Sequence, residues 1–66
     1  MLKIEVEREE DGRWIAEATA LPGVLAYGNT EAEAKAHAIS LALRVMADRI
    51  DNGEPLPDEA RNLFAA

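Results

Sequence analysis

The first part of the chain alternates between apolar and charged residues. Leu2, Ile4 and Val6 share one side of an extended segment, and each residue between them is charged. A period of two over residues 2–7 predicts a half-buried β-strand. The polar segment that follows closes on an Asp-Gly pair, which is typical of a hairpin turn when strand patterns flank it.

Two more extended segments follow this turn. Over residues 13–20, one face carries Trp14 and two alanines, whereas the other carries Ile15, Glu17 and Thr19. The alanines mark a place where another element packs closely. Pro22 interrupts the pattern because proline has no N–H for a ladder, and residues 24–27 then predict a third, short strand.

A long helix is predicted after the third strand. Thr30 and Glu33 have the spacing of a capping box, which marks a helix start. Nothing breaks the helix before about Asn52, and Gly53 with two nearby prolines is typical of a helix end.

Two apolar strips run along this helix. Residues spaced four and three apart form the strip that we predict to face the core: Ala32, Ala36, Ile39, Leu43, Met46 and Ile50. A second strip, which one small sheet does not obviously cover, is a candidate contact surface: Ala34, Ala38, Leu41, Ala42 and Val45. From this strip and the C-terminal segment we predict four residues for self-association: Leu41, Val45, Leu63 and Phe64.

These elements predict an α+β fold, with a three-stranded antiparallel sheet and one long helix packed on one face. The order is β-β-β-α. Three strands make a sheet only about 15 Å across, whereas a helix of this length reaches about 33 Å, so we expect the helix to overhang the sheet. We assign residues 1–57 to the domain and residues 58–66 to a tail that forms either a short fourth strand or a docking arm.

Length and charge narrow the possible functions. The chain has 66 residues, which is one domain. Its 13 acidic and 7 basic residues give a formal charge of −6, which disfavours direct binding to nucleic acid and steers basic partners toward the chain. Such a charge is also ordinary for a soluble protein. With no cysteine, no apolar run long enough to cross a membrane and a charged start, we expect a cytoplasmic protein without a signal peptide.

Few residues suggest catalysis. The only histidine, His37, falls on the polar face of the predicted helix. No hydroxyl lies in a nucleophile motif, and the glycines are scattered singly, without a phosphate-binding loop. Glu5, Glu7 and Glu17 are carboxylates of the kind that hold a hard cation, but glutamates on the solvent face of a strand are common, and Lys3 and Arg13 are near enough to neutralise them. We therefore expect no enzyme, metal or cofactor.

The same acidic strand face carries larger apolar side chains. Ile15, Leu25 and Tyr27 would lie beside the three glutamates if the strands pair as predicted. A mixed aromatic, aliphatic and charged surface suits the binding of another protein.

Four segments, in this order, resemble the HicB antitoxin family: EDGRWIAE at 10–17, LPGV at 21–24, GNTEAEA at 28–34 and GEPLP at 53–57. The resemblance implies a reduced ribonuclease-H-like domain that no longer cleaves RNA. It also implies a partner, a small basic HicA-like ribonuclease toxin, and assembly into a homodimer or tetramer.

The sequence departs from the family at its C-terminal end. Family members commonly carry a DNA-binding module there, and only sixteen residues follow Ile50, so we do not carry over operator binding. The spaced carboxylates of an active ribonuclease H are also missing.

These observations predict an antitoxin that covers its toxin. The predicted toxin-binding residues are Glu5, Glu7, Ile15, Glu17, Leu25 and Tyr27. The alternative is a non-catalytic, self-associating scaffold that has kept the fold and lost the toxin.

Overall fold

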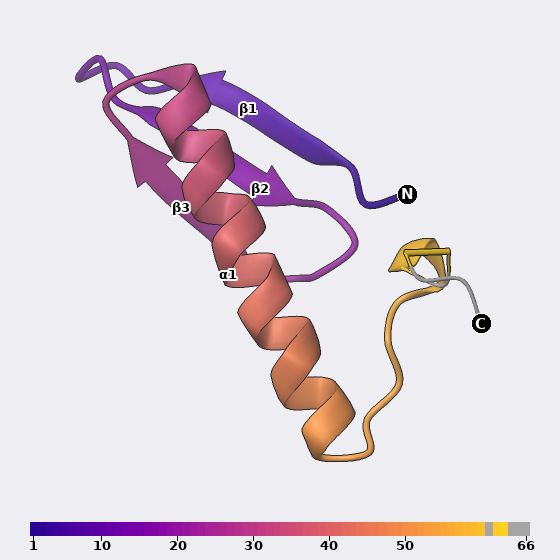
Figure 1. Cartoon of the computed structure of the whole chain (residues 1–66). Coiled ribbons are helices and arrows are strands. Elements are labelled where there is room, and N and C mark those ends of the chain that lie inside the picture. Colours follow the sequence, from indigo (N-terminus) through magenta and orange to yellow (C-terminus); the bar gives the residue numbers. More distant parts are fainter. Residues whose placement is uncertain (61, 64–66) are drawn as a thin grey trace.

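The computed structural model describes residues 1–60, 62 and 63 (Figure 1). Its elements are β1 (Ile4–Arg8), β2 (Trp14–Ala18), β3 (Leu25–Gly28), α1 (Glu31–Asp51) and a 3₁₀ turn, η1 (Asp58–Ala60). The strands form one antiparallel sheet in the order β1-β2-β3. The predicted α+β fold with one long helix on the sheet is confirmed.

The start of α1 follows the predicted cap with one change of partner. Thr30 is extended, and its hydroxyl accepts a hydrogen bond of 3.0 Å from the Glu33 amide. The Glu33 carboxylate reaches back to the amide of Asn29, at 3.2 Å, instead of that of Thr30. Two amides that precede the first helical hydrogen bond are thereby satisfied, and the chain is held where it leaves β3.

Small residues let α1 approach the sheet closely. Ala16 and Ala18 on β2 and Ala34 and Ala38 on α1 are completely buried. Gly28, at the end of β3, lies against the backbone of the first turn of α1, where a side chain would not fit. The alanines predicted to mark a close contact therefore do so, and the contact is with the helix.

The prediction of the helix face that packs on the sheet was wrong except at Met46, which is buried as expected. The buried helix residues are Ala34, Ala38, Ala42 and Met46. From the strip that we expected in the core, Ile39, Leu43 and Ile50 are instead 46%, 53% and 58% exposed. The strip with the smaller residues packs inward because β2 presents alanines, and only small side chains allow the helix to come this close.

The four residues predicted for self-association differ in their exposure. Leu41 and Val45 are half-buried and pack against the larger core cluster, which contains Leu21 and Val24. Leu63 is exposed, and Phe64 lies outside the described residues. Two of the four residues are thus used within the molecule.

The C-terminal segment returns toward the start of the chain. Figure 1 shows α1 extending past the sheet and the following residues running back beside it. Ala60 is buried, and the N-terminal amino group donates a 2.7 Å hydrogen bond to the carbonyl of Glu59. In its described residues, the tail forms the 3₁₀ turn η1 and lies beside the N-terminus of the same chain. No helix in the described part of the chain is long and apolar enough to cross a membrane.

Candidate functional site

The structure brings all six predicted toxin-binding residues to the face of the sheet opposite α1, here called the outer face. Its side chains form two rows across the strands. In the first row Glu5 lies opposite Glu17, and Glu17 lies opposite Leu25. In the second row, Glu7 lies opposite Ile15, and Ile15 lies opposite Tyr27. The strict alternation of the strands, together with this register, produces the surface.

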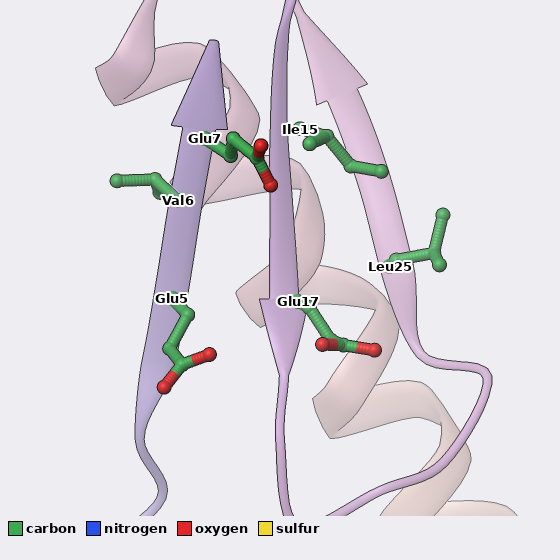
Figure 2. Close-up of a pocket in the computed structure, with 6 residues that line it drawn as sticks. All are labelled: Glu5, Val6, Glu7, Ile15, Glu17 and Leu25. Carbon is green, nitrogen blue, oxygen red and sulfur yellow. The ribbon is translucent and has the colours of Figure 1, made fainter. Parts of the chain in front are cut away.

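The outer face is slightly hollowed. A depression of about 190 Å³ is lined by five of the six residues and by Val6. Figure 2 shows the glutamates above β1 and β2, with Ile15 and Leu25 beside them, while Val6 points away from the group. Val6 packs toward the inner cluster of Ala16, Ala34 and Ala38. The depression is therefore acidic along β1 and apolar toward β3.

The carboxylates of this face are only partly neutralised. Glu5 and Glu17 are Cα partners on neighbouring strands, and like charges directly opposite each other are destabilising. Lys3 Nζ lies 3.2 Å from Glu5 Oε1, and both side chains are exposed. Among the described residues, neither Glu7 nor Glu17 has a side-chain hydrogen bond or ion pair. Two of the three carboxylates of the outer face thus lack a counter-ion among the described residues.

From the sequence we expected Arg13 to neutralise the glutamates, but the structure places its guanidinium elsewhere. Its Nε donates a 2.7 Å hydrogen bond to Asp11 Oδ2, and its guanidinium carbon lies 4.5 Å from the centroid of the Tyr27 ring. The backbone amide of Arg13 also donates to Asp11. The hydrogen bond from this amide is the largest cause that holds the pKa of Asp11 below its ordinary value, and the hydrogen bond from the guanidinium is the next. Arg13 therefore orders the hairpin and fixes Tyr27.

The acidic surface continues into the β1–β2 hairpin, which the sequence analysis did not include in the site. A wider, polar hollow adjoins Glu7 and Tyr27 and is lined further by Arg8, Glu9, Glu10, Asp11 and Arg13. The signal was present in the run of three acidic residues before Gly12. A partner large enough to cover the outer face would also meet this hairpin.

His37 and Trp14 do not belong to the outer face. The imidazole Nδ1 of His37 lies 2.8 Å from the carbonyl oxygen of Tyr27 and donates to it, which ties α1 to the outer edge of β3. Trp14 is half-buried on the helix side of the sheet, packed against the cluster of Ala34 and Ala38. Within the described chain, no group of three or more histidine, aspartate or glutamate side chains is arranged to hold a metal ion.

Comparison of the chain with known families, with curated proteins and with solved structures finds no match in any of the three. The function therefore has to be inferred from the outer face itself.

Proposed function

We propose that the outer face is a docking surface for a basic protein, and that the chain acts as a HicB-like antitoxin that covers a small HicA-like ribonuclease toxin. The observation that carries the proposal is the arrangement of the face. Three exposed carboxylates and three larger apolar side chains form two adjoining rows on one side of the sheet. The six residues named from the sequence belong to this one surface.

Electrostatics supports a basic partner. In the free chain, Glu5 faces Glu17 across the strand pair, an arrangement that costs a few tenths of a kcal/mol to about 1 kcal/mol. A lysine or arginine of a partner placed between the two carboxylates would remove this repulsion. Complementary charge also speeds association and selects against acidic partners.

The apolar residues supply the centre of the interface. Leu25 is 38% and Tyr27 41% exposed, and Ile15 lies between Tyr27 and Glu7. Tyrosine is among the residues that contribute most to binding at protein interfaces. Because Arg13 stacks on the Tyr27 ring, this side chain is partly fixed before a partner arrives, which lowers the entropy lost on binding.

The proposal assigns a non-catalytic role in the cytoplasm. The described residues offer carboxylates without a paired base or nucleophile, and the one histidine is hydrogen-bonded to the backbone of β3. Such a surface inhibits a ribonuclease by excluding RNA from it. A ribonuclease toxin acts where RNA is translated, which places its inhibitor in the same compartment.

The test is an RNA-cleavage assay with a small basic HicA-like ribonuclease toxin. We expect the unaltered chain to abolish cleavage at equimolar amounts, and Glu17→Lys to weaken inhibition about a hundredfold, since a buried charge pair then becomes a like-charge contact. Glu54→Lys is the matched control, because Glu54 is exposed beyond α1 and the net charge changes equally.

Two results would overturn the proposal. In the first, RNA cleavage continues undiminished in the presence of the unaltered chain. In the second, Glu54→Lys weakens inhibition as much as Glu17→Lys, which would show that overall charge acts and that the outer face does not.

A further inference from the structure

The outward edge of β1 carries backbone groups that no other described residue pairs. Lys3 accepts a hydrogen bond from the Thr19 amide, so the odd-numbered residues of this segment face β2. Because antiparallel ladders alternate, Ile4, Val6 and Arg8 direct their amide and carbonyl groups away from the sheet. No hydrogen bond from another described residue reaches these groups. An extended segment lying beside β1 can pair with them.

The side chains along this edge alternate in chemistry. Glu5 and Glu7 belong to the outer face, where Glu7 has no ion pair among the described residues and Glu5 meets only the exposed Lys3 of its own strand. Ile4 and Val6 are half-buried and pack against the apolar clusters beneath α1. Figure 2 shows Val6 directed away from the glutamates. The edge therefore offers acidic positions on one side of the sheet and apolar positions on the other.

The helix leaves this side of the sheet partly uncovered. α1 packs mainly on β3 and β2 and meets β1 least, and in Figure 1 β1 lies to one side of the helix. Ile39, which shares an apolar hollow with Ile4, is 46% exposed. Because Met1 and Leu63 already line that hollow, the edge that stays open is that of β1 itself.

We propose that β1 receives an extended segment of the basic partner as a fourth strand, antiparallel to β1, in which lysine or arginine alternates with apolar residues. The inference rests on the proposed function and names the part of the partner that docks. Side chains directly opposite each other in an antiparallel pair lie about 5 Å apart on the same face. The basic residues of the segment then lie opposite Glu5 and Glu7, and its apolar residues lie opposite Ile4 and Val6.

Charge decides which segments this edge accepts. A basic side chain opposite Glu7 supplies the counter-ion that this carboxylate lacks within the described chain. An acidic segment would instead place like charges directly opposite Glu5 and Glu7, which is destabilising. Main-chain hydrogen bonds give affinity to any added strand, whereas the side-chain pairs give specificity.

The first experiment measures binding of a synthetic peptide to the full chain by NMR-detected amide exchange. The probe, TKVKVET with blocked ends, is designed to place lysine opposite Glu7 and Glu5 and valine opposite Val6 and Ile4. We expect saturating peptide to slow exchange of the Ile4 and Val6 amides about tenfold, with little change at Glu5 and Glu7, which already face β2. A control peptide with glutamate in place of both lysines should bind about tenfold more weakly, because two attractive pairs become repulsive.

The second experiment blocks the edge without changing a side chain. Chemical synthesis of the 66-residue chain allows Val6 to be replaced by N-methylvaline, which lacks the outward N–H and fills space that an added strand needs. The pairing with β2 is retained, because this N–H faces away from it. We expect the variant to bind the lysine peptide, and to inhibit the toxin, about tenfold more weakly. N-methylation of Glu31 is the matched control, because Glu31 begins α1, where a missing N–H is tolerated.

The inference fails if the lysine peptide leaves exchange at Ile4 and Val6 unchanged, or if the glutamate peptide binds equally well. It also fails if these amides are already protected in the free chain in proportion to its concentration, which would put a second copy on the edge. The peptide arm uses the unaltered chain, so it decides the matter even where N-methylation at Val6 unfolds the variant, as circular dichroism would show.

The inference and the proposed function fail separately. If the folded chain with N-methylvaline at position 6 inhibits the toxin as well as the unaltered chain does, strand addition is wrong and the antitoxin function stands. If the lysine peptide binds as expected and RNA cleavage by the toxin continues undiminished, the antitoxin function is wrong and the strand-accepting edge stands.

Discussion

The two faces of the sheet differ in the size of the side chains that they carry. On the inner face, Ala16 and Ala18 are completely buried beneath α1, whereas the outer face carries Ile15, Leu25 and Tyr27 with three glutamates. Leu21 is the one large side chain fully buried in the described part of the chain. Close contact between helix and sheet thus uses small residues, with Trp14 half-buried beside them, and Ile15, Leu25 and Tyr27 on the outer face remain available to a partner.

This contrast predicts that the inner face tolerates no added volume, most of all at Gly28. A Cβ placed at this position meets the Ala34 amide nitrogen and comes within 2.9 Å of Ala34 Cα. Because these are backbone atoms of the helix, α1 has to move. We expect Gly28→Ala to lower the free energy of unfolding, measured by urea denaturation, by about 3 kcal/mol, most of what so small a core supplies.

Gly12→Ala is the control for this substitution. Gly12 has a φ of +91°, but a Cβ at this position would meet no neighbouring atom within 4 Å, so the cost is backbone strain alone, about 1 kcal/mol. Equal losses in the two variants would contradict the close approach of α1 at Gly28.

A second substitution on the inner face tests the contact at the middle of the helix. Ala38 is completely buried against the cluster that contains Ala16. We expect Ala38→Leu to cost about 2 kcal/mol by overpacking, measured by thermal and urea denaturation. Ala36→Leu, on the exposed side of the same helix, should change stability by less than about 0.5 kcal/mol. If Ala36→Leu lowered stability more than Ala38→Leu, the helix face that we first predicted from the spacing would be the one that packs on the sheet.

On the outer face, the effect on stability should be small and opposite in sign. Glu17→Lys replaces the carboxylate opposite Glu5 with a cation, so we expect the chain to become more stable by about 0.5 kcal/mol. Urea denaturation at low and high salt measures the gain, which should shrink with salt because both groups are exposed. A loss of more than about 1 kcal/mol would show that Glu17 supports the fold.

The smallest effect is expected at the hairpin. The pKa of Asp11 is lowered because the Arg13 amide and guanidinium donate to its carboxylate. A carboxyl with a depressed pKa in the folded chain stabilises the fold above its ordinary pKa of 3.8, and this contribution is lost as the pH falls through the lowered value. We expect Asp11→Asn to lower the melting temperature slightly at neutral pH, with the difference vanishing at low pH. A difference that is constant with pH would exclude the ionised pair as its source.

Local sequence patterns predicted the elements because each has a local cause. The alternation of β1 and β2, the Asp-Gly turn and the Thr30 cap depend on residues that are neighbours in the chain. The helix face was not predictable in this way, because both of its strips are apolar. Side-chain volume at the contact decides which strip packs on the sheet. The alanines of β2 and the backbone of Gly28 leave room for Ala34 and Ala38, whereas the larger Ile39 and Leu43 would hold the helix away.

The sequence predicted which residues belong to the candidate site, but it did not predict which of them lie opposite one another. Alternation alone puts Glu5, Glu7 and Glu17 on the same side of their strands. Which glutamate lies opposite which residue depends on the register of the hairpin, which spacing does not fix. The engagement of Arg13 with Asp11 and Tyr27 likewise depends on how the turn folds.

The hydrogen bond from His37 to the carbonyl of Tyr27 makes the two margins of the sheet unequal. Tyr27 lies opposite Ile15 of β2, and its carbonyl meets the imidazole at the other margin of β3, which has no further strand. A strand added at this margin would have to displace the imidazole from the carbonyl. Unpaired backbone groups on an edge strand are a template for aggregation, and this hydrogen bond removes one of them from β3.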